Sequence, residues 1–234
     1  MQLSVVIPAL NESQSITQVV NTVFKGLQIA GIDGEVIVAD NGSSDGTADL
    51  ARKAGAKVTL VVQKGYGNAI QGGCAVAQGQ WILIADGDNT YNFRDIKFYV
   101  TKLKDGYDFV IGNRFKGRYI PQSMPFLHRY LGTPVLTMLA DLFFRSGIGD
   151  INCGMRAFSK EAYTRMGLCS PGMEFASEMV AKASLAKLKI TEVPCTLYPA
   201  RKNRQPHLRA WRDGWRHLKL LCLIFLQKRG RFVS

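Results

Sequence analysis

Two aspartates separated by one glycine, Asp86 and Asp88, are the residues whose spacing most directly suggests chemistry. They follow the apolar run 81–85, whose length and composition predict a buried strand. Open α/β sheets bind their ligands at the carboxyl ends of the strands, where this pair would lie. Two carboxylates so placed can share one Mg²⁺ or Mn²⁺, and such a cation binds diphosphate oxygens. The alternative is a solvated turn, since Asp-Gly and Asp-Asn are ordinary turn formers.

The first half of the chain alternates predicted strands and helices, as expected of a nucleotide-binding α/β domain. Strands are predicted at 3–8, 35–39, 57–62 and 81–85, with helices at 47–54, at 67–78 and from a cap at 11–13 to about Ala30. This order predicts a parallel sheet with right-handed crossovers. The second half is less regular, with helices predicted at 93–104 and 175–187, strands at 108–114 and 189–197, and an apolar stretch at 125–148.

The composition is globular, and it limits the class of protein. At 234 residues, with 47% hydrophobic and 21% charged residues, the chain suits one large α/β domain or a domain with an appendage. Five scattered cysteines lack zinc-site spacing, which favours free thiols in a reducing compartment. The first strand begins at Leu3, without the charged and apolar leader of a signal peptide, so we predict a cytoplasmic location.

The positive charge is concentrated near the C-terminal end. The net charge is +12, and from residue 201 onward ten Lys and Arg residues accompany a single acid, Asp213. A basic end is typical of proteins that contact nucleic acid, an anionic membrane surface or a phosphorylated substrate. We predict a catalytic domain over residues 1–205 and a basic amphipathic tail over residues 206–234.

Within this tail, apolar residues recur at helical spacing beside a basic stripe. The apolar positions are Leu208, Trp211, Trp215, Leu218 and Cys222, and the basic ones are Arg209, Arg212, Arg216 and Lys219. Such a helix is typical of interfacial anchors, so we predict peripheral attachment to the cytoplasmic face of a membrane. The alternative is a helix that packs its apolar stripe on the catalytic domain or in a homodimer. No stretch has the roughly 20 apolar residues needed to cross a bilayer, and residues 125–144 are a second candidate to lie on it.

Several motifs together carry a resemblance to a known family. In order and spacing, residues 5–12 (VVIPALNE), 36–47 (VIVADNGSSDGT) and 85–88 (ADGD) resemble the nucleotide-sugar half of a family 2 glycosyltransferase with the GT-A fold. Residues 112–114 (GNR), 128–132 (HRYLG), 150–156 (DINCGMR) and 172–175 (GMEF) resemble the polyprenyl-phosphate glycosyltransferases, which include the dolichyl-phosphate mannose and glucose synthases. The resemblance covers roughly residues 3–205.

This resemblance implies a Rossmann-like GT-A fold, with a mostly parallel central sheet flanked by helices, and a site for a UDP- or GDP-hexose. It implies nucleotide-sugar contacts from Pro8, Leu10, Glu12, Asp40 and Asp86, and a Mg²⁺ or Mn²⁺ ion on Asp86 and Asp88. Glu12 has an alternative role in favouring a helix N-terminus, and Asp40 one as a turn residue. Two positions depart from the family: Asn41 replaces a second Asp, and Thr90 stands where Gln is frequent, which leaves the third metal ligand open.

The acceptor implied by the resemblance is a polyprenyl phosphate. A phosphate monoester is already ionised at neutral pH and needs cationic binding more than a general base. Arg suits this role because its guanidinium binds phosphate bidentately, although most arginines are solvated surface residues. Candidates for the acceptor phosphate are Arg114 and Arg129, which match the family pattern, with Arg201 and Arg204. We predict catalytic roles for Asp88, Arg114, Arg129 and Glu174, with Glu178 on the same helix face as Glu174.

The leading hypothesis is an inverting, metal-dependent transferase that moves a hexose from a nucleotide diphosphate to a dolichyl or undecaprenyl phosphate. A second hypothesis is transfer to a saccharide hydroxyl, which needs a catalytic base and often a Gln-x-x-Arg-Trp motif that residues 205–211 only approximate. A nucleic-acid-binding protein is the alternative of a different class, but it leaves the acidic pair without a role, so no nucleic-acid partner is expected. A dinucleotide-dependent oxidoreductase is excluded because no G-x-G-x-x-G follows the first strand.

Overall fold

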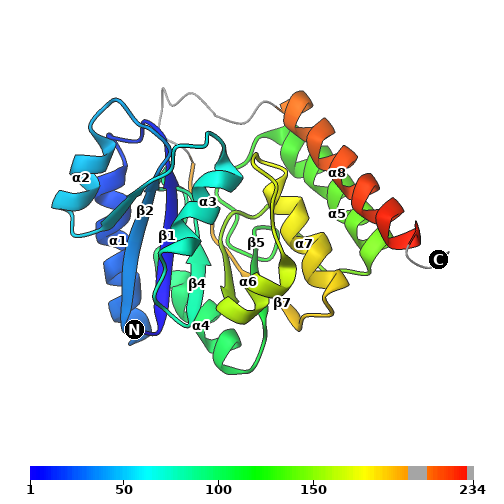
Figure 1. The fold of residues 1–234 in the computed structure, drawn as a ribbon, viewed down its shortest axis with the longest axis horizontal. Coiled ribbons are helices and arrows are strands. Elements are labelled where there is room, and N and C mark those ends of the chain that lie inside the picture. Colours follow the sequence, from blue (N-terminus) through cyan, green and yellow to red (C-terminus); the bar gives the residue numbers. More distant parts are fainter. Residues whose placement is uncertain (200–209, 231–234) are drawn as a thin grey trace.

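Seven strands form one sheet in the computed structural model, which describes residues 1–199 and 210–230 (Figure 1). Across the sheet the order is β3-β2-β1-β4-β6-β5-β7. The strands are β1 (Leu3–Ala9), β2 (Gly34–Asp40), β3 (Lys57–Leu60), β4 (Trp81–Ile84), β5 (Phe109–Asn113), β6 (Arg156–Ser159) and β7 (Ile190–Pro194). Of these, β6 alone runs antiparallel to its neighbours. The predicted α/β class with a mostly parallel sheet is therefore confirmed.

Eight α-helices and two short helical turns accompany the sheet in the described residues. They are α1 (Ile16–Ala30), α2 (Thr47–Lys53), α3 (Tyr66–Ala75), the 3₁₀ turn η1 (Phe93–Asp95), α4 (Ile96–Lys104), the π-helical turn η2 (His128–Gly132), α5 (Thr133–Phe144), α6 (Lys160–Met166), α7 (Phe175–Leu185) and α8 (Ala210–Gly230). The helices form two packed groups. In one group, α1 packs against α2 and α4. In the other, α7 packs against α3, α5, α6 and α8.

The direction of winding reverses at the centre of the sheet. From β1 the chain moves outward through β2 to β3, and then returns to place β4 on the other side of β1. Because βαβ crossovers are right-handed, this reversal puts α3 on the opposite face of the sheet from α1 and α2. Doubly wound sheets bind their ligands at such a reversal, outside the carboxyl ends of the strands. A site is therefore expected in the loops that follow β1 and β4.

The central strands are buried on both of their faces. Val5, Val6 and Ile7 of β1 and Leu83 of β4 have no exposed surface. Burial on both faces accounts for the nearly continuous apolar runs in these segments. All the predicted strands occur, with differences confined to their ends.

The first helix begins later than predicted. Residues 11–13, predicted as its cap, lie in the loop before α1, which begins at Ile16. Asn11 has a positive φ of 55°, its N–H donates to Ser43 Oγ, and its Oδ1 accepts from the N–H of Ser44. The prediction is wrong because Asn bonds the loop after β2 here rather than the end of its own helix.

β6 and α6 are absent from the sequence prediction, which also gives the segment of η2 and α5 only as an apolar stretch. Arg156 begins β6 with a fully buried side chain, whose guanidinium donates to the carbonyl oxygens of Ile151, Cys153 and Ala176. A four-residue strand that opens with a buried Arg has no apolar alternation by which it could be recognised. The 3₁₀ turn η1 also replaces the first turn of the helix predicted at 93–104.

The C-terminal helix packs on the rest of the domain, and it does so by a different stripe from the one predicted. The buried residues of α8 include Asp213, His217, Leu221 and Ile224, whereas Trp215 of the predicted stripe is 66% exposed. Figure 1 shows α8 beside α5, and α8 contacts both α5 and α7. The predicted packing stripe is wrong because a buried Asp and a buried His belong to the true one. Leu208 and Arg209 of the predicted stripes lie outside the described residues.

His217 links α8 to α7 and makes stability depend on pH. Its Nδ1 lies 2.6 Å from Ser177 Oγ. Burial lowers the pKa of His217 to about 4, and nearby Glu174 opposes the shift only in part. An unfolded histidine binds a proton below about pH 6.5, so lowering the pH from there to about 4 favours the unfolded state. We expect the free energy of unfolding to fall by up to about 3 kcal/mol over this range because of His217.

Urea unfolding at pH 7 and pH 5 measures this effect, with His217→Gln as the comparison. Glutamine keeps a hydrogen-bonding group near Ser177 but does not titrate. The wild-type protein should lose more stability than the variant between the two pH values, since carboxylates contribute equally to both. Equal losses in the two proteins would show that His217 is not the titrating group.

Candidate active site

A cavity of about 530 Å³ lies at the reversal point of the sheet. Its walls are built by the loops after β1, β2, β4 and β5, the start of α3, the loop before α7 and the first turns of α8. Six of the predicted site residues line it: Pro8, Leu10, Glu12, Asp86, Asp88 and Arg114. The structure thus brings together residues that are more than one hundred positions apart in the chain.

Asp86 and Asp88 are each held by a neighbouring hydroxyl group. Tyr66 Oη donates to Asp86 Oδ1 at 3.0 Å, and Thr90 donates to Asp88 Oδ1 from its N–H at 3.1 Å and its hydroxyl at 2.6 Å. Burial raises the pKa of Tyr66 and Asp86 raises it further, so the phenol keeps its proton and remains a donor. Thr90, one of the two departures from the family pattern, therefore orients Asp88.

The carboxylate pair fits a hard divalent cation. Both side chains line the cavity, and Gly154 packs so closely that a Cβ atom there would lie 2.6 Å from Asp86 Oδ2. Carboxylate oxygens are the ligands that Mg²⁺ and Mn²⁺ prefer. Within residues 1–199 and 210–230, no group of three or more His, Cys, Asp or Glu side chains could hold a metal ion. Asp86 and Asp88 would therefore share the ion with water or with oxygens of a bound ligand.

Glu12 is fastened to the loops on both sides of it. Its N–H donates to Thr47 Oγ1 at 2.9 Å, which ties the loop after β1 to the start of α2. Ser15 Oγ lies 3.0 Å from Glu12 Oε2 and 2.9 Å from the carbonyl oxygen of Gly87, between the two aspartates. Glu12 is also buried, so its side chain belongs to the wall of the cavity rather than to a solvated helix end.

Asp40 presents a buried oxygen at the end of β2. Its Oδ2 accepts the N–H groups of Gly42 and Ser43, and its Oδ1 is buried with no hydrogen-bond partner among the described residues. A buried acceptor left unpaired costs about 1–3 kcal/mol. Because Asp40 adjoins Ala9 and Asn41, which line the cavity, a bound ligand could donate to this oxygen.

The amide of Asn41 explains the other departure from the family pattern. Its Nδ2 donates to the carbonyl oxygens of Val61 and Gln63 at 3.0 and 2.8 Å, and its Oδ1 accepts from the N–H of Gly65 at 2.8 Å. A carboxylate could not make the two donated bonds. Asn41 thereby joins the loop after β2 to the loop before α3, where Lys64 Nζ donates to its carbonyl oxygen at 2.6 Å.

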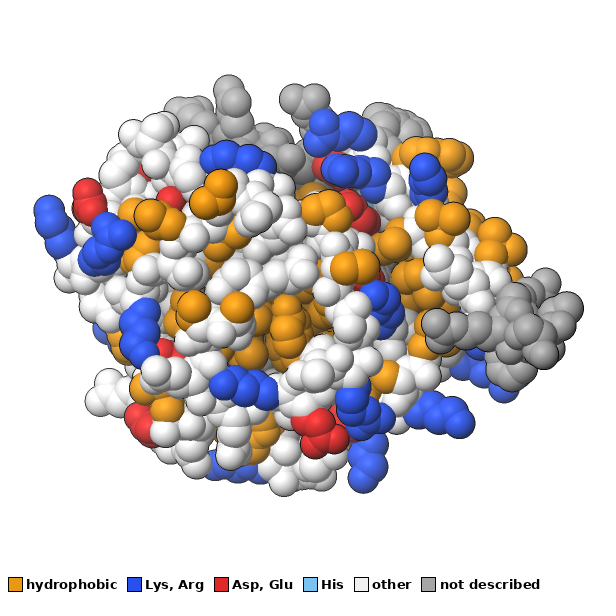
Figure 2. Space-filling model, viewed as in Figure 1, with side chains coloured by type: hydrophobic (Ala, Val, Ile, Leu, Met, Phe, Trp, Pro, Cys, Tyr) orange, Lys and Arg blue, Asp and Glu red, His pale blue; other side chains and the backbone are white. Residues whose placement is uncertain are grey.

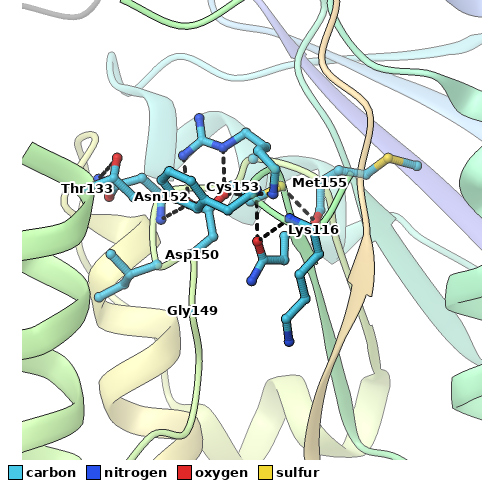
Figure 3. Close-up of polar contacts among 12 residues, drawn as sticks. Lys116, Thr133, Gly149, Asp150, Asn152, Cys153 and Met155 are labelled. Atoms are coloured by element: carbon cyan, nitrogen blue, oxygen red, sulfur yellow. Dashed lines mark hydrogen bonds and ion pairs between the residues drawn. The ribbon is translucent and has the colours of Figure 1, made fainter. Parts of the chain in front are cut away.

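Arg114 is fixed in the cavity wall by a bidentate ion pair with Asp150. Their Nε–Oδ2 and Nη2–Oδ1 distances are both 2.7 Å, and the N–H of Arg114 also donates to Oδ2 at 3.0 Å. Burial lowers the pKa of Arg114, but the completely buried Asp150 more than compensates, and the pKa is raised overall. Figure 3 shows Asp150 beside Asn152, another cavity residue, which donates to Thr133 at the start of α5.

The other predicted arginines and Glu174 lie differently. Arg129 is not among the residues that line the cavity, and its guanidinium lies 4.2 Å from the ring centroid of Tyr119. Buried Glu174 accepts the N–H of Gly172 and lies 3.7 Å from Arg216 Nε. Arg201 and Arg204 lie outside the described residues. The roles predicted for these four residues remain predictions.

Glu178 does not lie on a solvated helix face. It is 1% exposed, accepts the N–H groups of Cys169 and Ser170, and pairs with Lys182 at 2.7 Å. These contacts lower the pKa of Glu178 against the effect of burial, which alone would raise it. The loop before α7 covers this carboxylate, which binds the loop through two of its backbone N–H groups.

Several site residues were not singled out from the sequence. Arg212, Asp213 and Arg216 line the cavity although they belong to the segment predicted to be a membrane anchor. Asp150 was noticed only as part of a motif. An isolated acid within a basic helix is the signal that could have identified Asp213 as a buried residue.

The family model described as glycosyl transferase family 2 matches residues 4–167 of the chain. This chain belongs to glycosyl transferase family 2. The family predicted from the three N-terminal motifs is therefore confirmed.

Three proteins of Haloferax volcanii are similar in sequence. The low-salt glycan biosynthesis hexosyltransferase Agl6 is 39% identical over 94% of this chain and 53% of its own length. The glycosyltransferase AglJ is 33% identical over 88% of this chain and 66% of its own length. A dolichyl-phosphate hexose transferase is 30% identical over 82% of this chain and 81% of its own length. The chain thus spans about half the length of Agl6 and two thirds of that of AglJ.

Solved structures show the same fold. Mannosyl-3-phosphoglycerate synthase from Rubrobacter xylanophilus superposes with a TM-score of 0.71 at 22% identity, over 99% of this chain and 75% of its own. Glucosyl-3-phosphoglycerate synthase from Mycobacterium tuberculosis, in complex with Mn²⁺, UDP-glucose and phosphoglyceric acid, gives 0.67 at 22% identity, over 98% of this chain and 80% of its own. The predicted GT-A fold is confirmed.

Proposed function

We propose that this family 2 member is an inverting, metal-dependent glycosyltransferase that moves a hexose from a UDP- or GDP-sugar to a polyprenyl phosphate. The observation that carries the proposal is a single cavity that is lined by the Asp86–Asp88 pair and by Arg114. Carboxylates suit a metal-bound diphosphate, and a guanidinium suits a phosphate acceptor. One site therefore has groups for both substrates.

The donor would occupy the side of the cavity built by β1, β2 and β4. Pro8, Leu10 and Glu12 line that side, and the unpartnered Oδ1 of Asp40 suits an N–H donor such as the base. Asp86 and Asp88 would hold Mg²⁺ or Mn²⁺, which when bound neutralises charge on the departing diphosphate. The M. tuberculosis structure with Mn²⁺ and UDP-glucose supports a donor site of this kind on the shared fold.

The acceptor would need orientation rather than deprotonation. A phosphate monoester is already ionised at neutral pH, so a cavity that presents arginine to it suits direct displacement at the anomeric carbon. Such a displacement inverts the configuration and gives a β-linked lipid-phosphate sugar from an α-linked donor. The similarity to a dolichyl-phosphate hexose transferase supports a lipid phosphate as the acceptor.

We further propose that the protein lies on a membrane by the face formed by η2 and α5. Within the described chain no helix is both long and apolar enough to cross a bilayer. The residues of this face recur at helical spacing and are 40–71% exposed: Leu131, Val135, Met138 and Leu142. Phe126, just before η2, is 77% exposed. A contiguous apolar face of this kind marks an interaction surface, and the interfacial zone of a bilayer suits it.

Flotation with vesicles tests this attachment. Met138→Glu with Leu142→Glu should abolish co-flotation with anionic phospholipid vesicles, because two charges would enter the apolar zone. Ile29→Glu, which changes an exposed apolar residue of α1, is the matched control and should leave co-flotation unchanged. Undiminished flotation of the double variant would rule out this face as the attachment surface.

A transfer assay tests the reaction itself. Purified protein, Mn²⁺ or Mg²⁺ and a short polyprenyl phosphate are incubated with radiolabelled UDP-glucose, GDP-mannose or UDP-N-acetylglucosamine, and Asp88→Ala serves as the inactive control. We expect label to enter the organic phase with one donor, and to be absent with the variant or with EDTA. Metal-dependent donor hydrolysis without transfer would overturn the lipid acceptor but not the donor site. Absence of both hydrolysis and nucleotide binding would overturn the whole proposal.

A further inference from the structure

Two arginines of α8 line the same cavity as the carboxylate pair, although the helix follows the last strand of the sheet. We propose that Arg212 and Arg216 bind the phosphate of the acceptor, and that α8 is therefore part of the active site. This inference rests on the proposed function, because it names the residues that recognise one of its two substrates. Figure 2 shows Lys and Arg side chains gathered beside acidic ones over the start of α8.

Buried acids hold the two arginines at the mouth of the cavity. Asp213, whose side chain is 2% exposed, lies 3.5 Å from Arg212 Nε and 4.0 Å from Arg216 Nη1. Glu174 lies 3.7 Å from Arg216 Nε. These separations are those of ion pairs rather than of short hydrogen bonds, and the side chains of Arg212 and Arg216 remain 58% and 46% exposed. Their N–H groups can therefore reach a ligand while the acids fix the position of the charge.

The other cations of the cavity are already engaged. The guanidinium of Arg114 gives two short hydrogen bonds to Asp150, which also compensates its charge. Lys64 Nζ donates to the carbonyl oxygens of Asn41 and Gly42. If Asp86 and Asp88 hold a cation for the donor diphosphate, a dianionic acceptor needs positive charge of its own. Arg212 and Arg216 line the same cavity and can supply this charge together with Arg114.

The direction of α8 favours the acceptor over the donor. The starts of α5 and α8 both lie at the cavity: Asn152, a lining residue, bonds Thr133 at the start of α5, and Arg212 is near the start of α8. Farther along, Phe143 of α5 stacks on Phe225 of α8 with ring centroids 4.5 Å apart. The two helices thus leave the cavity side by side. A ligand whose apolar chain followed the exposed face of α5 would present its head group to the start of α8.

The group that the two arginines would recognise is a phosphate monoester, which occurs both in a lipid phosphate and in a soluble phosphorylated acid. Two exposed guanidinium groups at the mouth of a cavity bind the phosphate itself and do not select what is attached to it. Selection between the two sources would depend on the apolar face of α5, which a soluble acid does not need. Both kinds of acceptor are therefore included in the test.

The test compares Arg212→Gln, Arg216→Gln and the double variant with Lys219→Gln. Lys219 is exposed on the same helix and does not line the cavity, so its variant removes an equal charge from outside the site. A short polyprenyl phosphate and phosphoglyceric acid are each titrated calorimetrically into protein that contains Mn²⁺ and UDP. UDP binding is measured separately as a check of folding and of the donor site.

We expect at least one of the two phosphates to bind the wild-type protein, and the double variant to bind it about 10- to 100-fold more weakly. Lys219→Gln should match the wild-type protein, and the dissociation constant of UDP should change less than about 2-fold in every variant. A weaker UDP affinity with unchanged phosphate affinity would overturn the inference by moving the arginines to the donor. So would unchanged affinity for both UDP and the phosphate, or failure of both phosphates to bind the wild-type protein.

The inference and the proposed function can fail separately. Arginine-dependent binding of a polyprenyl phosphate without sugar transfer to it would support the inference and overturn the function. Arginine-dependent binding of phosphoglyceric acid alone would support the phosphate role and replace the lipid by a soluble acceptor. In an active enzyme, the Michaelis constant for the acceptor should rise in the double variant while that for the donor stays the same.

Discussion

Replacement of Asp150 by Asn is expected to lower the free energy of unfolding by about 3–5 kcal/mol. Asp150 is completely buried, and it accepts three hydrogen bonds from Arg114, whose side chain is only 12% exposed. An asparagine has one acceptor oxygen and no charge, so the substitution would leave a nearly buried guanidinium uncompensated. The guanidinium would also lose its fixed position in the cavity, and we expect transfer to fall at least about 100-fold.

Urea unfolding and the transfer assay measure the two effects together. The matched control is Lys102→Gln, which removes one member of the exposed pair with Asp105 and should cost less than about 1 kcal/mol. A double variant, Arg114→Leu with Asp150→Leu, should recover much of the stability but none of the activity, because two apolar groups need no compensation. If the free energy of unfolding of Asp150→Asn were within about 1 kcal/mol of that of the wild-type protein, Arg114 and Asp150 would not form a buried, coupled ion pair.

Most of the fold could be predicted because the amino-acid composition of the main strands indicates that they are buried. The run at β4 is apolar at every position and that at β1 at every position but Ser4, as expected of strands buried on both faces. β6 could not be predicted in this way, because its first residue is an arginine buried by hydrogen bonds to three carbonyl oxygens. That environment exists only after the loops around it have folded.

In the candidate site, too, some residues could be predicted from the sequence and others could not. Asp86 and Asp88 could be predicted because both follow one strand and lie two residues apart. That Arg212 and Arg216 belong to the candidate site could not be predicted, because a basic amphipathic pattern is compatible with a membrane surface, with nucleic acid and with an active site. What decides between these possibilities is Asp213, which is buried against the domain and turns its side of α8 toward the cavity. The single acid Asp213 therefore indicates the position of α8 better than the basic amphipathic pattern around it does.

Addition of one methyl group at Gly154 is expected to reduce transfer at least about 100-fold by displacing Asp86, which we propose as a metal ligand. A Cβ atom at this position would lie 2.6 Å from Asp86 Oδ2 and 2.9 Å from Tyr91 Oη. Asp86 cannot move away without cost, because its other oxygen accepts the hydrogen bond from Tyr66. Tyr91 is likewise held, since its hydroxyl accepts the N–H of Gly154 itself. We therefore expect Gly154→Ala to turn the Asp86 carboxylate and to weaken its hold on a divalent cation.

The measurement is the Mn²⁺ concentration that gives half-maximal transfer, together with Mn²⁺ binding followed by electron paramagnetic resonance in the presence of UDP. Gly214→Ala is the matched control: it adds the same methyl group in open space within α8 and should raise stability by about 0.5–1 kcal/mol through helix propensity. Gly154→Ala should raise the required Mn²⁺ concentration while UDP binding in the absence of metal stays unchanged, because the nucleotide contacts that we propose lie on β1, in the loop after it and at the end of β2. A variant that kept wild-type affinity for Mn²⁺ would show that Asp86 is not a ligand of the ion, and the metal would then have to be assigned to Asp88 alone.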